Sequence, residues 1–100
     1  MNQKLARRRY KALIAAVKAA VDAADPIRLL EIGAPSDEYD PEVRTIVPRV
    51  AKAADEAEVH RIVHEEFKRW FGIDTAGPIA NYEVPAREIW QAVLRFRRAD

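Results

Sequence analysis

The strongest helix signal in this chain is the stretch D-E-A-E-V-H-R-I-V-H-E-E-F-K-R-W-F-G, residues 55–72. Asp55 and Glu58 have the spacing of a capping box, which fixes the start of a helix. Gly72 suits a helix end, where Ile73 can fold back as the hydrophobic contact. The apolar residues recur every three or four positions and predict one buried helix face: Val59, Ile62, Val63, Phe67, Trp70 and Phe71.

Residues 2–24 carry the same periodicity and many alanines, which favour a helix. Asp25 stands before a proline, and that position is pushed out of the helical region, so we expect this helix to end there. Residues 26–32 then predict a short helix or turn, which Gly33 closes.

A further helix is expected over residues 40–54. Asp40 can cap it, Pro41 suits its first position, and Glu42 meets the positive end of the helix dipole. Pro48 lies inside this segment and removes one backbone hydrogen bond. We therefore expect a kink at this proline, or a break followed by a restart.

The last helix covers at least residues 86–97 and begins either near Pro78 or at Pro85. No sustained alternation of apolar and polar residues and no hairpin dipeptide indicates a strand. We therefore predict one all-α domain over residues 1–100. It is a small bundle of four main helices, with a short extra helical turn near residues 26–32.

Composition excludes several classes of protein. The 100 residues contain no cysteine, so a disulfide framework, a thiolate metal site and a cysteine nucleophile are all excluded. The apolar runs are too short to cross a membrane, and no signal peptide pattern is present, so we expect a soluble cytoplasmic protein. The net charge of +1 hides an uneven layout, because residues 1–11 hold five basic residues and no acid, whereas residues 31–42 hold five acids and no base.

One segment, G-A-P-S-D-E-Y-D-P-E at residues 33–42, is explained neither by helix formation nor by core filling. Its acids do not follow the spacing of a calcium-binding loop. Loops on a rigid scaffold often carry binding residues. Tyr39 either plugs the core beneath the loop or presents its ring to a partner, and we favour the plug. The candidate binding residues of this loop are Asp37, Glu38, Tyr39 and Glu42.

The wider segment D-P-I-R-L-L-E-I-G-A-P-S-D-E-Y-D-P-E-V, residues 25–43, is followed by F-x-x-W-F-G at residues 67–72. This combination resembles a family of small bacterial all-helical proteins of unknown function, and the D-E-Y-D-P-E block is its specific part. The resemblance implies an all-helical fold and a bacterial source. It lends no activity, cofactor or catalytic residue.

His60 and His64 lie one helical turn apart, a spacing that can hold a metal ion. Position 61 is an arginine, so the glutamate of the metalloprotease arrangement is missing, and Glu56 is the remaining candidate for a third ligand. We favour the alternative in which both histidines form hydrogen bonds to neighbours. No metal or other cofactor is expected.

Glu66 falls in the middle of the apolar face of the helix over residues 55–71. A carboxylate in such a place is desolvated unless it is paired or hydrogen-bonded. Catalytic carboxylates have this character, and so do structural ones that hold an arginine. In the absence of a second acid or a nucleophile motif, we favour the structural role.

The basic ends of the chain raise the question of nucleic-acid binding. Arg7, Arg8 and Arg9 spread around their helix instead of lining one side, and R-F-R-R at residues 95–98 adds a second cluster. Phosphate contacts require a basic stripe on one face, so solvated helix ends are the favoured interpretation.

We therefore expect a non-catalytic module that binds another protein, of a regulatory or immunity type, through the acidic loop at residues 33–42. The first alternative is a nucleic-acid-associated protein that uses the basic helix ends. The second is a metal-dependent enzyme centred on His60, His64 and Glu66.

Overall fold

A computed structural model describes residues 3–35 and 37–98. The described residues contain α-helices and one 3₁₀ turn but no strand, which confirms the predicted all-α fold. In chain order the elements are α1 (Gln3–Ala24), α2 (Asp40–Val50), α3 (Glu56–Phe71), α4 (Ile73–Ala76), η1 (Ile79–Tyr82) and α5 (Glu83–Arg98).

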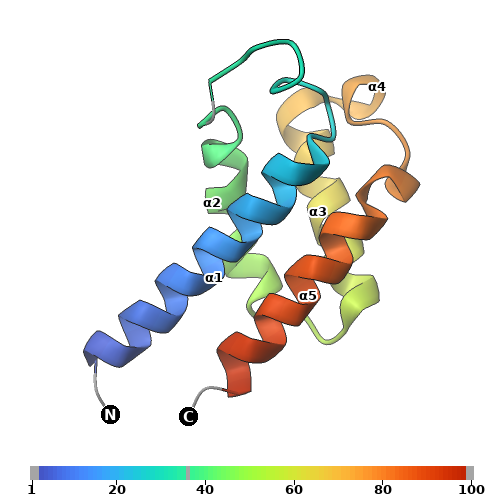
Figure 1. Cartoon of the computed structure of the whole chain (residues 1–100). Helices are drawn as coiled ribbons and strands as arrows, with labels where there is room; N and C mark the ends of the chain where they lie inside the picture. The colour runs from blue at the N-terminus through green and yellow to red at the C-terminus, as the bar shows by residue number, and fades with distance from the viewer. Residues whose placement is uncertain (1–2, 36, 99–100) are drawn as a thin grey trace.

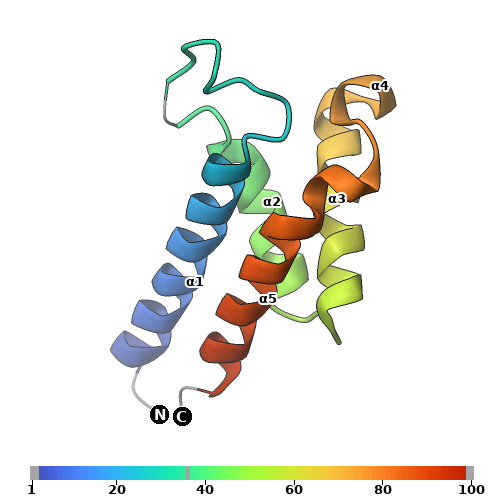
Figure 2. The same cartoon turned by 45° about the vertical axis from the view of Figure 1, so that its right-hand side comes forward.

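The four long helices form two layers. α1 and α5 run side by side in opposite directions, and α2 and α3 lie behind them (Figures 1 and 2). The smallest dimension of the molecule is 19 Å, which is close to the width of two helices. As a result, the start of α1 and the end of α5, both rich in arginine, lie at the same end of the bundle.

The core is built around three aromatic rings. The ring of Phe67 lies 5.7 Å from that of Tyr39 and 5.2 Å from that of Tyr82, measured between centroids. The prediction that Tyr39 plugs the core is confirmed, because none of its surface is exposed. Buried aliphatic side chains from all four long helices complete the core; they include Leu13, Val17, Val21, Ile46, Val50, Val59, Val63, Ile89 and Val93.

The core covers only part of α1. All four buried residues of this helix lie between Leu13 and Val21, and none of residues 3–12 is buried. Figure 2 shows α5 beside the first half of α1, and residues 3–12 are all exposed or partly exposed.

The predicted start of α3 is confirmed in detail. The carboxylate of Asp55 accepts a hydrogen bond from the Glu58 amide at 2.8 Å, and the Glu58 side chain reaches back to the Ala54 amide at 2.6 Å. Gly72 ends the helix with a φ of 86°, where glycine avoids the penalty that a side chain incurs.

Two expectations for the end of α3 are wrong, and the structure also decides where the last helix begins. Ile73 does not fold back onto α3; it begins α4 and is 74% exposed. Trp70 is 45% exposed, and its indole donates a 3.0 Å hydrogen bond to the Thr45 hydroxyl of α2. The chain becomes helical directly after Pro78, as the 3₁₀ turn η1, and the α-helix itself begins at Glu83. Pro85 therefore lies in the first turn of α5, where it costs no backbone bond.

Two expectations for the earlier segments also need correction. Asp40 forms no side-chain cap of α2; its carboxylate instead lies 2.9 Å from the ammonium group of Lys18 in α1. The predicted break with a restart at Pro48 is wrong, because α2 continues through this proline to Val50 and turns follow. Residues 26–33 form turns with one bond of helical type, from the Ile32 amide to the Arg28 carbonyl at 3.3 Å.

Candidate functional site

The loop between α1 and α2 is fixed by Asp25 and Tyr39. Asp25 accepts hydrogen bonds from the Tyr39 hydroxyl at 2.5 Å and from the amides of Leu30 and Glu31 at 3.1 and 2.9 Å. The Tyr39 oxygen in turn accepts bonds from the amides of Ile27 and Leu29, both at 3.4 Å. One buried phenol and one carboxylate thus hold the loop to the end of α1.

These hydrogen bonds and the burial of the pair shift the pKa values of both Asp25 and Tyr39. Burial alone raises the pKa of Asp25, but the hydrogen bonds from Tyr39 and from the backbone amides outweigh it and lower the pKa below its ordinary value. Burial raises the pKa of Tyr39, and its bond to Asp25 raises the pKa further. At neutral pH the pair is therefore a carboxylate that accepts and a phenol that donates.

Two of the four predicted loop-binding residues are not available to a partner. Tyr39 is completely buried, and Glu42 is only 4% exposed. Asp37 and Glu38 are exposed and lie on the outer part of the loop. The acidic surface predicted for residues 33–42 is therefore reduced to two adjacent carboxylates.

Glu42 is an unusual buried acid. Its Oε2 atom is buried and has no hydrogen-bond partner. Burial raises the pKa of Glu42, and the nearby charges of Glu38 and Asp40 raise it further. The protonated form is thus favoured more strongly than in an exposed glutamate.

His60 and His64 both hold the segment that leads into η1. The Nε2 atom of His60 lies 2.7 Å from the carbonyl oxygen of Ile79, and that of His64 lies 2.8 Å from the carbonyl oxygen of Gly77. A carbonyl only accepts, so both Nε2 atoms carry a proton and donate. Among the described residues, no cluster of three histidine or acidic side chains could hold a metal ion.

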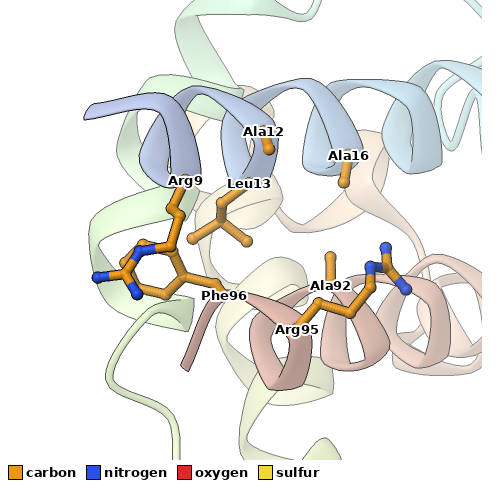
Figure 3. A pocket seen from close by; sticks show the side chains of 7 residues that line it. All are labelled: Arg9, Ala12, Leu13, Ala16, Ala92, Arg95 and Phe96. Carbon is orange, nitrogen blue, oxygen red and sulfur yellow. The ribbon is translucent and has the colours of Figure 1, made fainter. Parts of the chain in front are cut away.

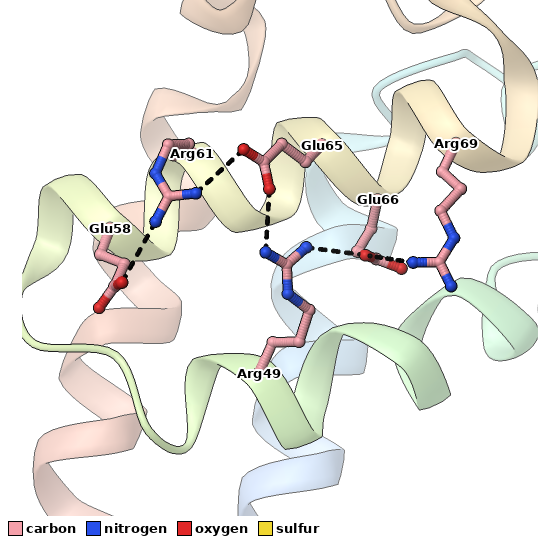
Figure 4. Close-up of polar contacts among 6 residues, drawn as sticks. All are labelled: Arg49, Glu58, Arg61, Glu65, Glu66 and Arg69. Atoms are coloured by element: carbon pink, nitrogen blue, oxygen red, sulfur yellow. Dashed lines mark hydrogen bonds and ion pairs between the residues drawn. The ribbon is translucent and has the colours of Figure 1, made fainter.

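Glu66 is paired, as the structural interpretation predicts. It is 1% exposed, and its Oε2 atom lies 2.8 Å from the guanidinium group of Arg49 and 3.4 Å from that of Arg69. Figure 4 shows that this pair belongs to a chain of charges that joins α2 to α3. Glu65 bridges Arg49 and Arg61 at 2.9 and 3.0 Å.

The charge of Glu65 is stabilised by this network. Arg49, followed by Arg61, lowers the pKa of Glu65 below its ordinary value. Glu65 and Glu66, together with Arg49, Arg61 and Arg69, therefore form a structural clamp of five charged groups between α2 and α3. The Oε1 atom of Glu66 is buried and has no hydrogen-bond partner in this clamp.

The most distinctive open surface lies between α1 and α5. It is a groove of about 230 Å³ at the edge of the core, where the uncovered part of α1 meets the buried Leu13. We name it the α1–α5 groove. Its lining residues are Arg9, Ala12, Leu13, Ala16, Ala92, Arg95 and Phe96 (Figure 3).

The residue types explain the shape of the α1–α5 groove. Three alanines leave its walls thin, while Leu13 and Phe96 provide an apolar floor. In Figure 3 the guanidinium group of Arg9 lies at the Phe96 end, and that of Arg95 lies toward Ala16. The groove thus combines an apolar interior with a cation at each end.

A basic stripe runs along another face of the same half of α1. Lys4, Arg7, Arg8 and Lys11 line one shallow depression of about 240 Å³. The sequence interpretation missed this stripe because it considered only three consecutive arginines. The spacing of positions 4, 7, 8 and 11 places all four on one helix face, and it could have revealed the stripe.

Exposed apolar side chains accompany these cations. Tyr10 and Ile14 are both 37% exposed, and with Ala6 they line a third depression beside Arg7 and Lys11. No acidic residue lines any of these three depressions in the part of the chain that the structure describes. In the part of the chain that the structure describes, these three depressions are therefore lined by apolar and basic side chains.

No family model, curated protein or solved structure matches this chain. The resemblance of residues 25–43 to a bacterial family accordingly remains a prediction. Within the described residues, no helix is long and apolar enough to cross a membrane.

Proposed function

We propose that this protein is a non-catalytic protein-binding module, and that its main docking surface is the α1–α5 groove. The observation that supports this proposal is the apolar groove beside α1, which begins next to residues 3–12, none of which is buried, and reaches the core at Leu13. Apolar surface rimmed by polar residues is typical of protein interaction sites.

The proposal moves the docking surface away from the acidic loop. Tyr39, Asp40 and Glu42 each have a structural contact or a buried position, so they contribute little to an outer surface. Asp37 and Glu38 remain exposed on a loop that the Asp25–Tyr39 pair holds in place. They form a secondary surface, and Glu38→Lys tests its contribution.

Nucleic-acid binding is the second candidate, and the basic stripe of Lys4, Arg7, Arg8 and Lys11 favours it. Cations on one helix face can follow a phosphate backbone. Such binding uses no apolar groove, however, and leaves the adjacent apolar residues exposed. Protein binding accounts for both the cations and the apolar surface.

An enzymatic role is not proposed. The strongest catalytic candidates, His60, His64 and Glu66, each hold a neighbouring part of the fold. Their committed hydrogen bonds favour a structural role over proton transfer or metal binding.

Site-specific photo-crosslinking in cells that encode this protein tests the proposal. A crosslinking residue at Ala12 lies in the α1–α5 groove, whereas one at Ala15 is exposed on the same helix but outside it. We expect a defined protein, identified by mass spectrometry, to be attached from position 12 and not from position 15. Attachment of nucleic acid, or of protein from Glu38 alone, would contradict the proposed surface.

A further inference from the structure

We infer that the α1–α5 groove accepts an acidic amphipathic helix from the partner protein. This inference rests on the proposed function, since it specifies the occupant of the same surface. It is supported by three properties of the groove: its length, its thin walls and the sign of the charge around it.

The length of the groove suits a short helical segment. Its α1 wall runs from Arg9 to Ala16, which corresponds to about 10 Å, or two helical turns. A helix bound in a groove presents apolar side chains at intervals of three and four residues. Two such side chains, one turn apart, fit along Leu13 and Phe96.

The walls of the groove allow close approach. Ala12 and Ala16 on α1 face Ala92 on α5, so only methyl groups separate an incoming helix from the two backbones. Helices pack with their axes about 8 to 10 Å apart, and the closer distances require small side chains at the contact. An added helix would continue the layer packing already present between α1 and α5.

The charges specify an acidic occupant. Arg95 belongs to the groove itself, and Arg7, Arg8 and Lys11 belong to the adjacent stripe. In the described part of the chain no carboxylate lines either surface. Glutamate or aspartate on the flanks of the bound helix would complement these cations and steer its approach.

The same charges disfavour a second copy of this chain. In a two-fold dimer through the groove, Arg9 and Arg95 would face the same cations of the other copy. Like charges opposed across an interface are repulsive. An anionic membrane and a nucleic acid also satisfy the cations, but neither presents a narrow apolar ridge that fills a groove between two helices.

The test uses a designed peptide of about 18 residues, long enough to form a helix, with leucines at i, i+4 and i+7 and glutamates on both flanks. Binding to the full protein is measured by fluorescence anisotropy. Matched peptides carry lysine or glutamine in place of glutamate. We expect the acidic peptide to bind most tightly, the glutamine peptide more weakly and the lysine peptide not at all, with affinity for the acidic peptide falling as salt is added.

Protein variants locate the binding. Arg95→Glu replaces one attraction by a repulsion and should weaken binding by about tenfold. Arg44→Glu makes the same charge change on the exposed surface of α2 and should have no effect. Ala12→Leu fills the groove and should weaken binding, whereas Ala15→Leu, outside the groove on the same helix, should not.

The inference is overturned if the acidic peptide fails to bind, or if Arg95→Glu and Ala12→Leu leave its affinity unchanged. It is also overturned if duplex DNA or vesicles of anionic lipid bind through the groove more tightly than the peptide. If the peptide fails while a protein still crosslinks from position 12, the proposed function stands and only the identity of the occupant is wrong.

Discussion

The hydroxyl of Tyr39 donates a 2.5 Å hydrogen bond to Oδ1 of Asp25, which lies fourteen residues earlier in the chain. This contact joins the last residue of the loop between α1 and α2 to its first residue. Asp25 and Arg28 both have left-handed backbone conformations, with φ of 45° and 62°. The hydrogen bonds to Asp25 and Tyr39 hold the loop in that strained path.

Tyr39→Phe should destabilise the protein by about 1 to 3 kcal/mol. The change removes only the hydroxyl group. The Asp25 carboxylate and the amides of Ile27 and Leu29 then each lose one hydrogen bond. The free energy of unfolding can be measured by urea titration. Tyr10→Phe is the matched control, because Tyr10 is 37% exposed and should be nearly neutral. Equal stability of the two variants would show that the loop is held by packing alone.

Glu42→Gln should stabilise the protein at pH 7. Burial and neighbouring acids raise the pKa of Glu42 in the folded state, so its folding contribution is most favourable below the ordinary glutamate pKa and is lost as pH rises through the folded pKa. Glutamine removes that loss. The melting temperature of the variant should therefore exceed that of the wild type at pH 7, and the difference should shrink near pH 3. A gain of equal size at both pH values would rule out ionisation as the cause.

Removing Arg49 alone should lower the stability of the protein more than removing both Arg49 and its partner Glu66. Arg49→Leu leaves the 1% exposed Glu66 with only the longer contact to Arg69, and we expect a loss of about 3 kcal/mol. The double variant Arg49→Leu with Glu66→Leu should recover a large part of that loss, because no buried charge remains unpaired. Thermal unfolding of the single and double variants measures this directly. Additive losses would indicate that the two side chains do not depend on each other.

Zinc or nickel should leave the melting temperature unchanged. The Nε2 atoms of His60 and His64 both donate to backbone carbonyls, so binding a metal through them requires breaking those contacts. A metal at a hundred times its dissociation constant would add about 2.7 kcal/mol of stability, which thermal unfolding detects easily. A shift that a chelator reverses and that His60→Ala abolishes would establish a metal site.

The elements that local chemistry specifies were predictable from the sequence. The start of α3 follows from Asp55 and Glu58, which act within one turn of each other, and its end follows from Gly72. The need of Glu66 for a cation was also evident, because a carboxylate on an apolar helix face cannot remain unpaired. Which of several arginines would serve could not be predicted, since Arg49 lies on a different helix.

The candidate site depended on tertiary structure to a greater degree. The α1–α5 groove joins residues 9–16 to residues 92–96, and only the packing of the first helix against the last brings them together. The acidic loop was over-interpreted for the same reason. Its conspicuous residues make contacts with Lys18 and Asp25 in the preceding segment, and no local pattern reveals those contacts.

The most direct test of the central claim is a map of the residues that change when the acidic peptide binds to the isotope-labelled protein. Backbone amide chemical shifts report each position separately. We expect the largest changes at Ala12, Ala16, Ala92 and Phe96, with little change at Asp37 and Glu38. Changes concentrated in the loop at residues 34–39, with the groove residues unaffected, would contradict it.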